Sequence, residues 1–209
     1  MLVRKTYDQY CPVAHALDLV GDRWALLVIR ELLRGPRRYT DLIEHLHGIG
    51  TNILASRLRD LEACGIVAKR RLPPPAAAQV YELTEYGQGL RPALRELAIW
   101  GARSLGPPGQ REELFSGWLV NALDTVLAPI APPGRFEFRI GGEVASIEDG
   151  AAREGPIEEP DVVVEGEPAG LYHLFVDRRL DQVSITGDRK LLERLIDVAP
   201  QPVELPSVA

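Results

Sequence analysis

The sequence predicts an α+β protein of two parts: a small helical domain that carries a β-hairpin, and a C-terminal α/β sandwich. Charge divides the chain, because residues 1–106 hold 15 Lys and Arg against 11 Asp and Glu, whereas residues 107–209 hold 9 against 19. A Gly-Pro-Pro-Gly stretch at 106–109 marks a linker at the same place. Alternating runs typical of strands are concentrated in the acidic part. We therefore expect domains at 1–106 and 112–209, joined by a linker at 107–111.

The composition limits the class of protein. With 209 residues, of which 45% are hydrophobic, the chain is long enough to build two modest cores. No run of about 18 apolar residues is present, so we expect no membrane span. The first residues lack the apolar segment of a signal peptide, and two cysteines are too few for a disulfide framework. A cytoplasmic protein is therefore expected.

Two helices are expected at the start of the chain. The first covers residues 12–20, because Pro12 suits the first turn of a helix and Gly21-Asp22 interrupts the apolar pattern. The second covers residues 23–34, is apolar on most sides and is stopped by Gly35-Pro36. We expect this second helix to lie at the centre of the first core.

Two further short helices are separated by a glycine-bearing turn. Residues 38–46 predict one amphipathic helix, residues 47–50 a turn of the length that a helix-turn-helix needs, and residues 51–65 the other helix. The inner stripe of the last helix consists of Leu54, Leu58 and Leu61, and its outer side carries Asn52, Ser56 and Arg59.

The ends and the outer side of the helix at 51–65 bear on its role. Side-chain oxygens of Thr51 or Asn52 are expected to cap its start, and Gly65 is expected to end it. A short helix with small polar residues and one Arg outward fits a major groove and reaches base edges. On this stretch alone, an ordinary amphipathic surface helix is the simpler interpretation.

A basic β-hairpin follows this helix. Residues 66–72 and 79–83 are predicted as two strands, with a Pro- and Ala-rich insert as the tip between them. Helix, turn, helix and hairpin in this order predict a winged helix-turn-helix, whose second helix enters the major groove of double-stranded DNA. Basic residues at the hairpin base suit phosphates, which supply most of the affinity for DNA.

The predicted DNA-binding residues fall into two groups, one facing base edges and one contacting phosphates. The base-facing group is Asn52, Ala55, Ser56 and Arg59, next to Thr51 at the helix start, and the phosphate group is Arg38, Arg57, Lys69, Arg70 and Arg71.

A long helix is expected at residues 88–105. Its apolar face is too broad for one small domain, and a surplus apolar face commonly indicates a partner helix. We interpret it, together with the helix at 12–20, as the interface of a homodimer. Packing of the same face against the C-terminal domain is the alternative.

Several ordered motifs of residues 7–104 resemble the HxlR family of winged-helix transcription regulators. They are Tyr10-Cys11-Pro12, Leu19-Val20-Gly21-Asp22-Arg23-Trp24, Leu32 to Tyr39, Arg57-Leu58, Leu61-Glu62, Gly65-Ile66-Val67, Tyr81-Glu82-Leu83-Thr84 and Trp100-Gly101. The resemblance implies a bacterial or archaeal origin, homodimerisation and binding to a roughly palindromic operator. It also implies a redox or electrophile-sensing role for Cys11, whose alternative is a small buried residue that docks the N-terminal segment.

The acidic part alternates helices and strands. A helix at 112–127 is followed by strands at 135–140 and 143–147 around the Gly141-Gly142 turn, a weak strand at 151–153, a strand at 161–165, a helix at 168–176, a strand at 182–186 and a helix at 188–198 capped by Asp188.

The order of elements in residues 112–200, with Asp161-Val162-Val163-Val164 and Val183 to Asp188, resembles the sterol-carrier-protein-like domain. The resemblance implies a mainly antiparallel sheet covered by helices, with an elongated cavity that binds an apolar small molecule by burial. Alternatively, the same side chains fill the core and leave no cavity. The candidate ligand-binding residues are Phe115, Trp118, Leu119, Phe136, Phe138, Leu171, Leu174 and Phe175.

No chemistry-bearing constellation stands out. The four histidines lack Cys or carboxylate partners at metal spacing, and phosphate-loop, nucleophile-elbow and dinucleotide motifs are missing, so no metal, cofactor or catalytic residue is expected. The sequence therefore predicts a dimeric DNA-binding repressor, not an enzyme, controlled by an apolar effector. The alternatives are redox control through Cys11, and a lipid-carrier or interaction protein whose helix-turn-helix binds no DNA.

Overall fold

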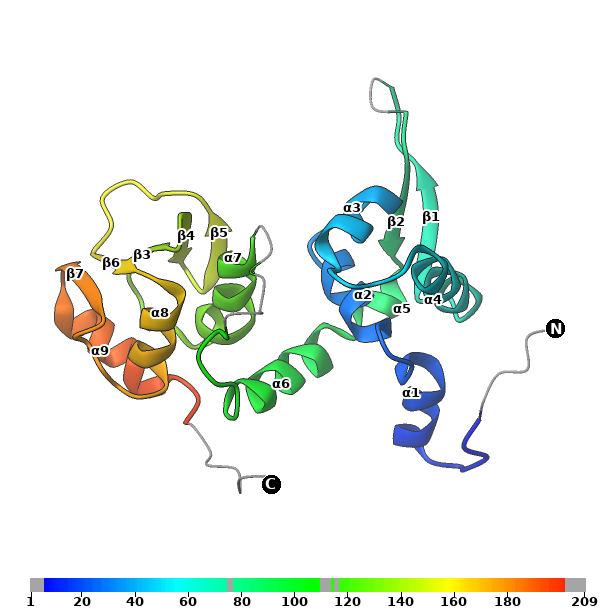
Figure 1. Cartoon of the computed structure of the whole chain (residues 1–209), viewed down its shortest axis with the longest axis horizontal. Helices are drawn as coiled ribbons and strands as arrows, with labels where there is room; N and C mark the ends of the chain where they lie inside the picture. Colours follow the sequence, from blue (N-terminus) through cyan, green and yellow to red (C-terminus); the bar gives the residue numbers. More distant parts are fainter. Residues whose placement is uncertain (1–5, 75–76, 110–113, 115–116, 202–209) are drawn as a thin grey trace. The chain divides into compact units, whose positions relative to one another are not determined.

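The computed structural model describes residues 6–74, 77–109, 114 and 117–201. The chain divides into two compact units, residues 1–94 and 95–209 (Figure 1). In the described ranges, no helix combines the length and the apolar character needed to cross a membrane. The domain limits at 106 and 112 remain a prediction.

The first unit consists of helices and one hairpin. Its elements are α1 (Pro12–Val20), α2 (Ala25–Leu32), α3 (Tyr39–His45), α4 (Thr51–Ala63), β1 (Val67–Arg71), β2 (Gln79–Leu83) and α5 (Glu85–Gln88), and α6 (Arg91–Ala102) begins in it. As predicted, α2 is central, because Val28, Ile29 and Leu32 are at most 1% exposed. The predicted helix at 88–105 is shorter, since Thr84 caps the separate helix α5 through the N–H of Gly87 (3.1 Å) and α6 starts only at Arg91.

The two ends of α4 differ in how well the sequence predicted them. Gly50, and neither Thr51 nor Asn52, occupies the N-cap, so the predicted side-chain cap is wrong: Thr51 is already helical. At the other end the prediction is confirmed. Gly65 adopts φ +70°, its N–H donates to Glu62 O (3.0 Å), and the next N–H donates to Leu61 O (2.9 Å), which satisfies the last carbonyls of the helix.

The hairpin is a regular antiparallel pair that projects beyond the helices of its unit (Figure 1). Its register runs from Val67 opposite Leu83 to Arg71 opposite Gln79. Arg37 and Tyr81 exchange two backbone hydrogen bonds of 2.9 and 2.8 Å, which ties the segment before α3 to β2. Residues 75–76 of the predicted tip lie outside the described residues.

The second unit contains a five-stranded sheet. Its strands β3 (Phe136–Ile140), β4 (Glu143–Glu148), β5 (Ala151–Glu154), β6 (Val162–Gly166) and β7 (Val183–Gly187) pair in the order β5-β4-β3-β6-β7. Only the β3–β6 pair is parallel, so the sheet is mainly antiparallel as predicted, and all five expected strands are present.

In this strand order, β6 lies next to β3 on the side away from β4. Residues 155–161 must therefore pass from β5 across β4 and β3 to reach β6. The crossing lies on the face that carries Glu137, since the N–H of Ile157 donates to its carboxylate at 2.9 Å. Glu137 is only 1% exposed and also accepts from Arg139 at 2.7 Å. A buried, fully bonded carboxylate thus anchors the crossing segment.

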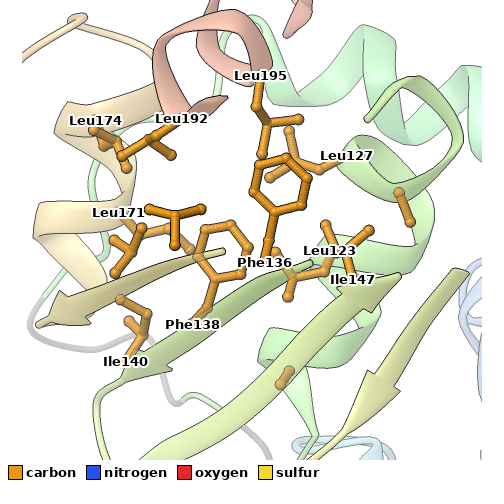
Figure 2. Close-up of a cluster of buried hydrophobic side chains, with 14 of the residues drawn as sticks. Leu123, Leu127, Phe136, Phe138, Ile140, Ile147, Leu171, Leu174, Leu192 and Leu195 are labelled. Atoms are coloured by element: carbon orange, nitrogen blue, oxygen red, sulfur yellow. The ribbon is translucent and has the colours of Figure 1, made fainter. Parts of the chain in front are cut away.

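Helices cover the opposite face of the sheet, where Phe136 and Phe138 point (Figure 2). They are α7 (Trp118–Ala122), the π-helical turn η1 (Leu123–Leu127), the 3-10 turn η2 (Ala128–Ile130), α8 (Pro168–Phe175) and α9 (Arg189–Val198). Asp188 caps α9 through the N–H of Leu191 at 3.1 Å, as predicted. The helix expected at 112–127 begins, in the described part, only at Trp118, and residues 110–113 and 115–116 lie outside that part.

Candidate nucleic-acid interface

The outer side of α4 presents polar groups to solvent. Asn52 and Arg59 are exposed, and Arg59 Nε donates to the carbonyl of Ala55 at 3.2 Å, so its side chain lies along the helix. Ser56 is half-buried, with its hydroxyl 3.5 Å from the carboxylate of Asp60. Amide, hydroxyl and guanidinium groups of this kind can form hydrogen bonds with base edges.

The inner side of α4 fixes that outer face in place. Leu54, Leu58 and Leu61 are at most 1% exposed and belong to one core cluster with residues of α2 and α3. The Tyr39 hydroxyl donates to the carbonyl of Thr51 at 2.6 Å, which joins the start of α3 to the start of α4. The polar face is therefore carried by a packed scaffold.

The basic residues of the hairpin are not equivalent. Arg70 Nε lies 2.8 to 2.9 Å from both carboxylate oxygens of Glu82. Lys69 Nζ lies 3.6 Å from a carboxylate oxygen of Glu62 and 5.5 Å from the ring centroid of Tyr81. Arg71 is exposed and has no carboxylate partner among residues 6–74, 77–109 and 117–201. Arg71 is the last residue of β1 and pairs with Gln79 next to the tip, so its expected place at the hairpin base is wrong, and its charge is not neutralised by a carboxylate of the described residues.

Arg57 lies away from the outer side of α4. Its guanidinium forms ion pairs with Asp22 and, at 3.0 Å, with Asp60, and its side chain is 18% exposed. The structure places this predicted phosphate contact in an intramolecular network, where two carboxylates already neutralise its charge.

Two arginines precede α3, and the sequence interpretation used only one of them. Arg38 is exposed, and its backbone N–H donates to Asp41 at 2.9 Å. Arg37 is half-buried, is bonded to Tyr81 through its backbone, and its buried Nε has no hydrogen-bond partner. Neither guanidinium forms an ion pair in the described segments. The signal for Arg37 was its position beside Arg38 directly after the Gly35-Pro36 turn.

The predicted apolar ligand residues form the core of the second unit. Leu119, Phe136, Phe138 and Leu174 are completely buried, and the side chains of the sheet and helices contact one another in Figure 2. The rest of the set varies in exposure: Leu171 is 9% exposed, Trp118 and Phe175 are partly buried, and Phe115 lies outside the described residues. Two surface pockets, of about 790 and 300 Å³, are lined by other residues.

Cys11 is the N-cap residue of α1 and is half-buried, with no disulfide partner. Cys64 follows α4 and packs against the first core. Within the part of the chain that the structure describes, no group of three or more His, Cys, Asp or Glu side chains is arranged to hold a metal ion.

Comparison with known proteins bears on the first part of the chain. The profile of the HxlR-like helix-turn-helix family matches residues 19–108. The transcriptional regulator YodB of Bacillus subtilis is 35% identical over 98 residues, which cover 46% of this chain and 88% of that protein. The regulator YvaP of the same organism is 30% identical over 101 residues, covering 48% of this chain and 94% of YvaP.

A further relative and a solved structure extend this comparison. The regulator sll1512 of Synechocystis is 39% identical over 84 residues, and the chain covers 62% of its length. The structure of reduced YodB from B. subtilis is 33% identical, with a TM-score of 0.41, and covers 48% of this chain and 100% of that one. YodB has also been solved in a quinone-bound form.

Proposed function

Because the chain belongs to the HxlR-like helix-turn-helix family of transcriptional regulators, we propose that it is a homodimeric repressor that binds a roughly palindromic operator in double-stranded DNA. The single observation that carries the proposal is the polar outer face of α4, in a unit where the exposed Arg38 and Arg71 have no carboxylate partner among the described residues. Such cations are the groups that phosphates neutralise. Its action on genomic DNA implies a cytoplasmic location.

The contacts divide between bases and backbone. Asn52, Ala55, Ser56 and Arg59 face base edges in the major groove, with Thr51 at the helix start. Phosphates are contacted by Arg38 and by the hairpin residues Lys69, Arg70 and Arg71, which set the register of the protein on the duplex.

Dimerisation is supported by apolar side chains that the described chain leaves exposed. On α1, Val13 is 68% and Leu17 46% exposed, and on α6, Trp100 is 68% and Leu97 46% exposed. None of the residues of α6 is fully buried. Half-sites one helical turn apart are separated by about 34 Å, so the proposed dimer has to present its two α4 helices at that spacing.

The second unit is proposed as a sterol-carrier-like effector domain. Its mainly antiparallel sheet has one face covered by helices, as that resemblance implies. Because Phe136, Phe138 and Leu174 are completely buried, an apolar effector would have to separate α8 from the sheet to enter. Native mass spectrometry of protein from its own host tests this, since a co-purifying apolar molecule supports the proposal and a clean dimer in repeated preparations contradicts it.

The DNA-binding proposal is tested by selecting duplexes from a random pool with the purified protein. An inverted repeat should be enriched, and fluorescence anisotropy should show that Arg59→Ala lowers the preference for this site over a scrambled duplex by about tenfold. Arg194→Ala, which removes an exposed arginine from α9, is the matched control and should change neither affinity. A pool without an enriched sequence would contradict sequence-specific binding.

Redox control is the second candidate function. Cys11 is partly accessible at the start of α1, and the relative YodB is known in a quinone-bound form. Operator release by benzoquinone in the wild-type protein but not in Cys11→Ser would support it. Equal release in both proteins would remove it. The remaining rival is a carrier or interaction protein that binds no DNA, and the selection experiment decides against it if a sequence is enriched.

A further inference from the structure

Arg57 connects two elements that lie far apart in the sequence. Its guanidinium bridges Asp22, which precedes α2, and Asp60, one turn further along α4. Asp22 and Arg57 are 35 positions apart, so their ion pair joins the corner between α1 and α2 to the recognition helix of the proposed function. We call this cluster of Asp22, Arg57 and Asp60 the corner clamp.

The helix geometry separates Arg57 from the base-facing residues. Since an α-helix turns 100° per residue, Arg57 points about 160° away from Arg59 and about 140° away from Asn52. A side chain in that direction lies on the flank of the helix beside the buried leucines. In agreement with this, only 18% of the Arg57 side chain is exposed.

The corner that holds Asp22 has a restricted conformation. A Cβ on Gly21 would lie 2.4 Å from the carbonyl oxygen of Leu17, so only glycine fits where α1 ends. Trp24 adopts φ +78°, a left-handed conformation that is unusual for an aromatic residue, and its side chain packs against the first core. Asp22 is therefore attached to a defined piece of backbone.

Between this corner and α4 runs a groove of about 790 Å³, lined by Asp22, Arg57, Asp60 and residues of α1. The ion pair of Arg57 with Asp22, whose side chain is 70% exposed, joins the two sides of this groove. The planar guanidinium suits this role, because it binds two carboxylates at once in a set geometry.

We propose that Arg57 is a positioning residue for DNA recognition, and that the corner clamp adds to the buried leucines in holding the orientation of α4 relative to α1 and α2. The inference rests on the proposed function, and it replaces a phosphate contact of Arg57 by an indirect role. Since α1 leads directly into Asp22, the clamp also connects the proposed dimer helix to the helix that reads the operator.

The two roles predict opposite results for Asp22→Asn. If Arg57 positions α4, loss of its partner weakens operator binding by about threefold to tenfold. If Arg57 instead contacts a phosphate, removal of the competing carboxylate strengthens binding. Fluorescence anisotropy with the selected operator over a range of salt concentrations measures both the affinity and its salt dependence.

Arg57→Gln and the double variant complete the cycle. For a positioning residue, Arg57→Gln should match Asp22→Asn, the double variant should add little, and the slope of log K against log salt should stay at the wild-type value. Arg59→Gln, the same change on the outer side of α4, is the control and should relax sequence preference. Asp22→Glu, which keeps the charge, should restore most of the affinity.

Three outcomes would overturn the inference: tighter binding by Asp22→Asn, additive effects in the double variant, or a salt slope that falls by about one unit per protomer in Arg57→Gln. Failure of the wild-type protein to bind any duplex would instead contradict the proposed function. In that case the wild-type protein, Asp22→Asn, Arg57→Gln and the double variant still test the corner clamp. The effects of Asp22→Asn and Arg57→Gln on the midpoint of thermal unfolding should then be non-additive.

Discussion

The two units differ in how some of their arginines are paired. In the second unit, five arginines form ion pairs with carboxylates of the same unit: Arg135, Arg139, Arg153, Arg179 and Arg189. In the first unit, four arginines have no carboxylate partner in the described ranges: Arg37, Arg38, Arg59 and Arg71. The pairing has measurable consequences in the second unit. Arg179 lowers the pKa of Asp181 to about 2, and hydrogen bonds to Glu137 and then to Glu165 raise the pKa of Arg139. In the first unit, Arg38, Arg59 and Arg71 are exposed cations whose charge an external anion such as a phosphate can neutralise.

Apolar side chains are exposed in both units. The second unit buries a cluster of large apolar residues between the sheet and the helices (Figure 2), but Leu97 and Trp100 at its start are exposed. In the first unit, α1 keeps Val13 and Leu17 exposed although a full core lies beside it. The first unit thus leaves cations without carboxylate partners and apolar side chains exposed, as the proposed contacts with DNA and with a second copy lead us to expect.

The largest effect is expected where the second unit is most completely packed. Phe138 is fully buried, and its ring lies 6.3 Å from that of Phe175. Phe138→Ala should lower the free energy of unfolding of the second unit by about 3–5 kcal/mol, because it removes a large side chain and leaves a cavity. Urea unfolding followed by circular dichroism measures this loss.

A matched pair of controls lies on β6. Val164 points into the core and is fully buried, whereas the neighbouring Val163 points to the other face and is only partly buried. Val164→Ala should therefore destabilise clearly more than Val163→Ala. A loss below about 1 kcal/mol in Phe138→Ala would contradict a packed core and favour a lined, ligand-sized cavity.

The elements themselves were largely predictable, and the exceptions have local causes. Periodicity and turn residues located every strand of the described residues, because alternation and Gly or Pro boundaries are local signals. The cap at Thr51 failed because one residue of register decides whether a side chain caps a helix or lies inside it. The helix at 88–105 was too long because Thr84 starts a separate turn first.

The second effect in size concerns the exposed apolar faces. Trp100→Glu should shift the protein from dimer to monomer and raise the dimer dissociation constant at least about tenfold, because twofold symmetry introduces the buried charge twice. Analytical ultracentrifugation at micromolar concentrations measures the shift. Tyr86→Glu, at a residue of α5 that is 60% exposed, is the control and should leave the dimer intact. Dimers unaffected by both Trp100→Glu and Leu17→Glu would show that these faces serve another contact.

The candidate site was only half predictable. Its position followed from the order of helix, turn, helix and hairpin, which is a property of the sequence. Which cations form ion pairs could not be predicted from the sequence. Arg57 pairs with Asp22, 35 positions away, and Arg70 pairs with Glu82 across the hairpin. A helical wheel already places Arg57 and Arg59 on different sides of α4, in agreement with their separate assignment to phosphates and to bases.

The smallest effects concern the hairpin, where neighbouring arginines differ only in pairing. Arg71→Gln should lower the magnitude of the slope of log K against log salt by about one unit per protomer, because Arg71 has a full charge available for a phosphate. Arg70→Gln should lower it less, since Glu82 already neutralises that guanidinium at 2.8 Å. Glu82→Gln should then strengthen binding by about twofold, the size expected from an exposed ion pair. Anisotropy titrations of the three variants decide the matter. Equal slopes for Arg70→Gln and Arg71→Gln would mean that Arg70 leaves Glu82 when DNA binds, and that pairing in the free protein is a poor guide to the contacts of this hairpin.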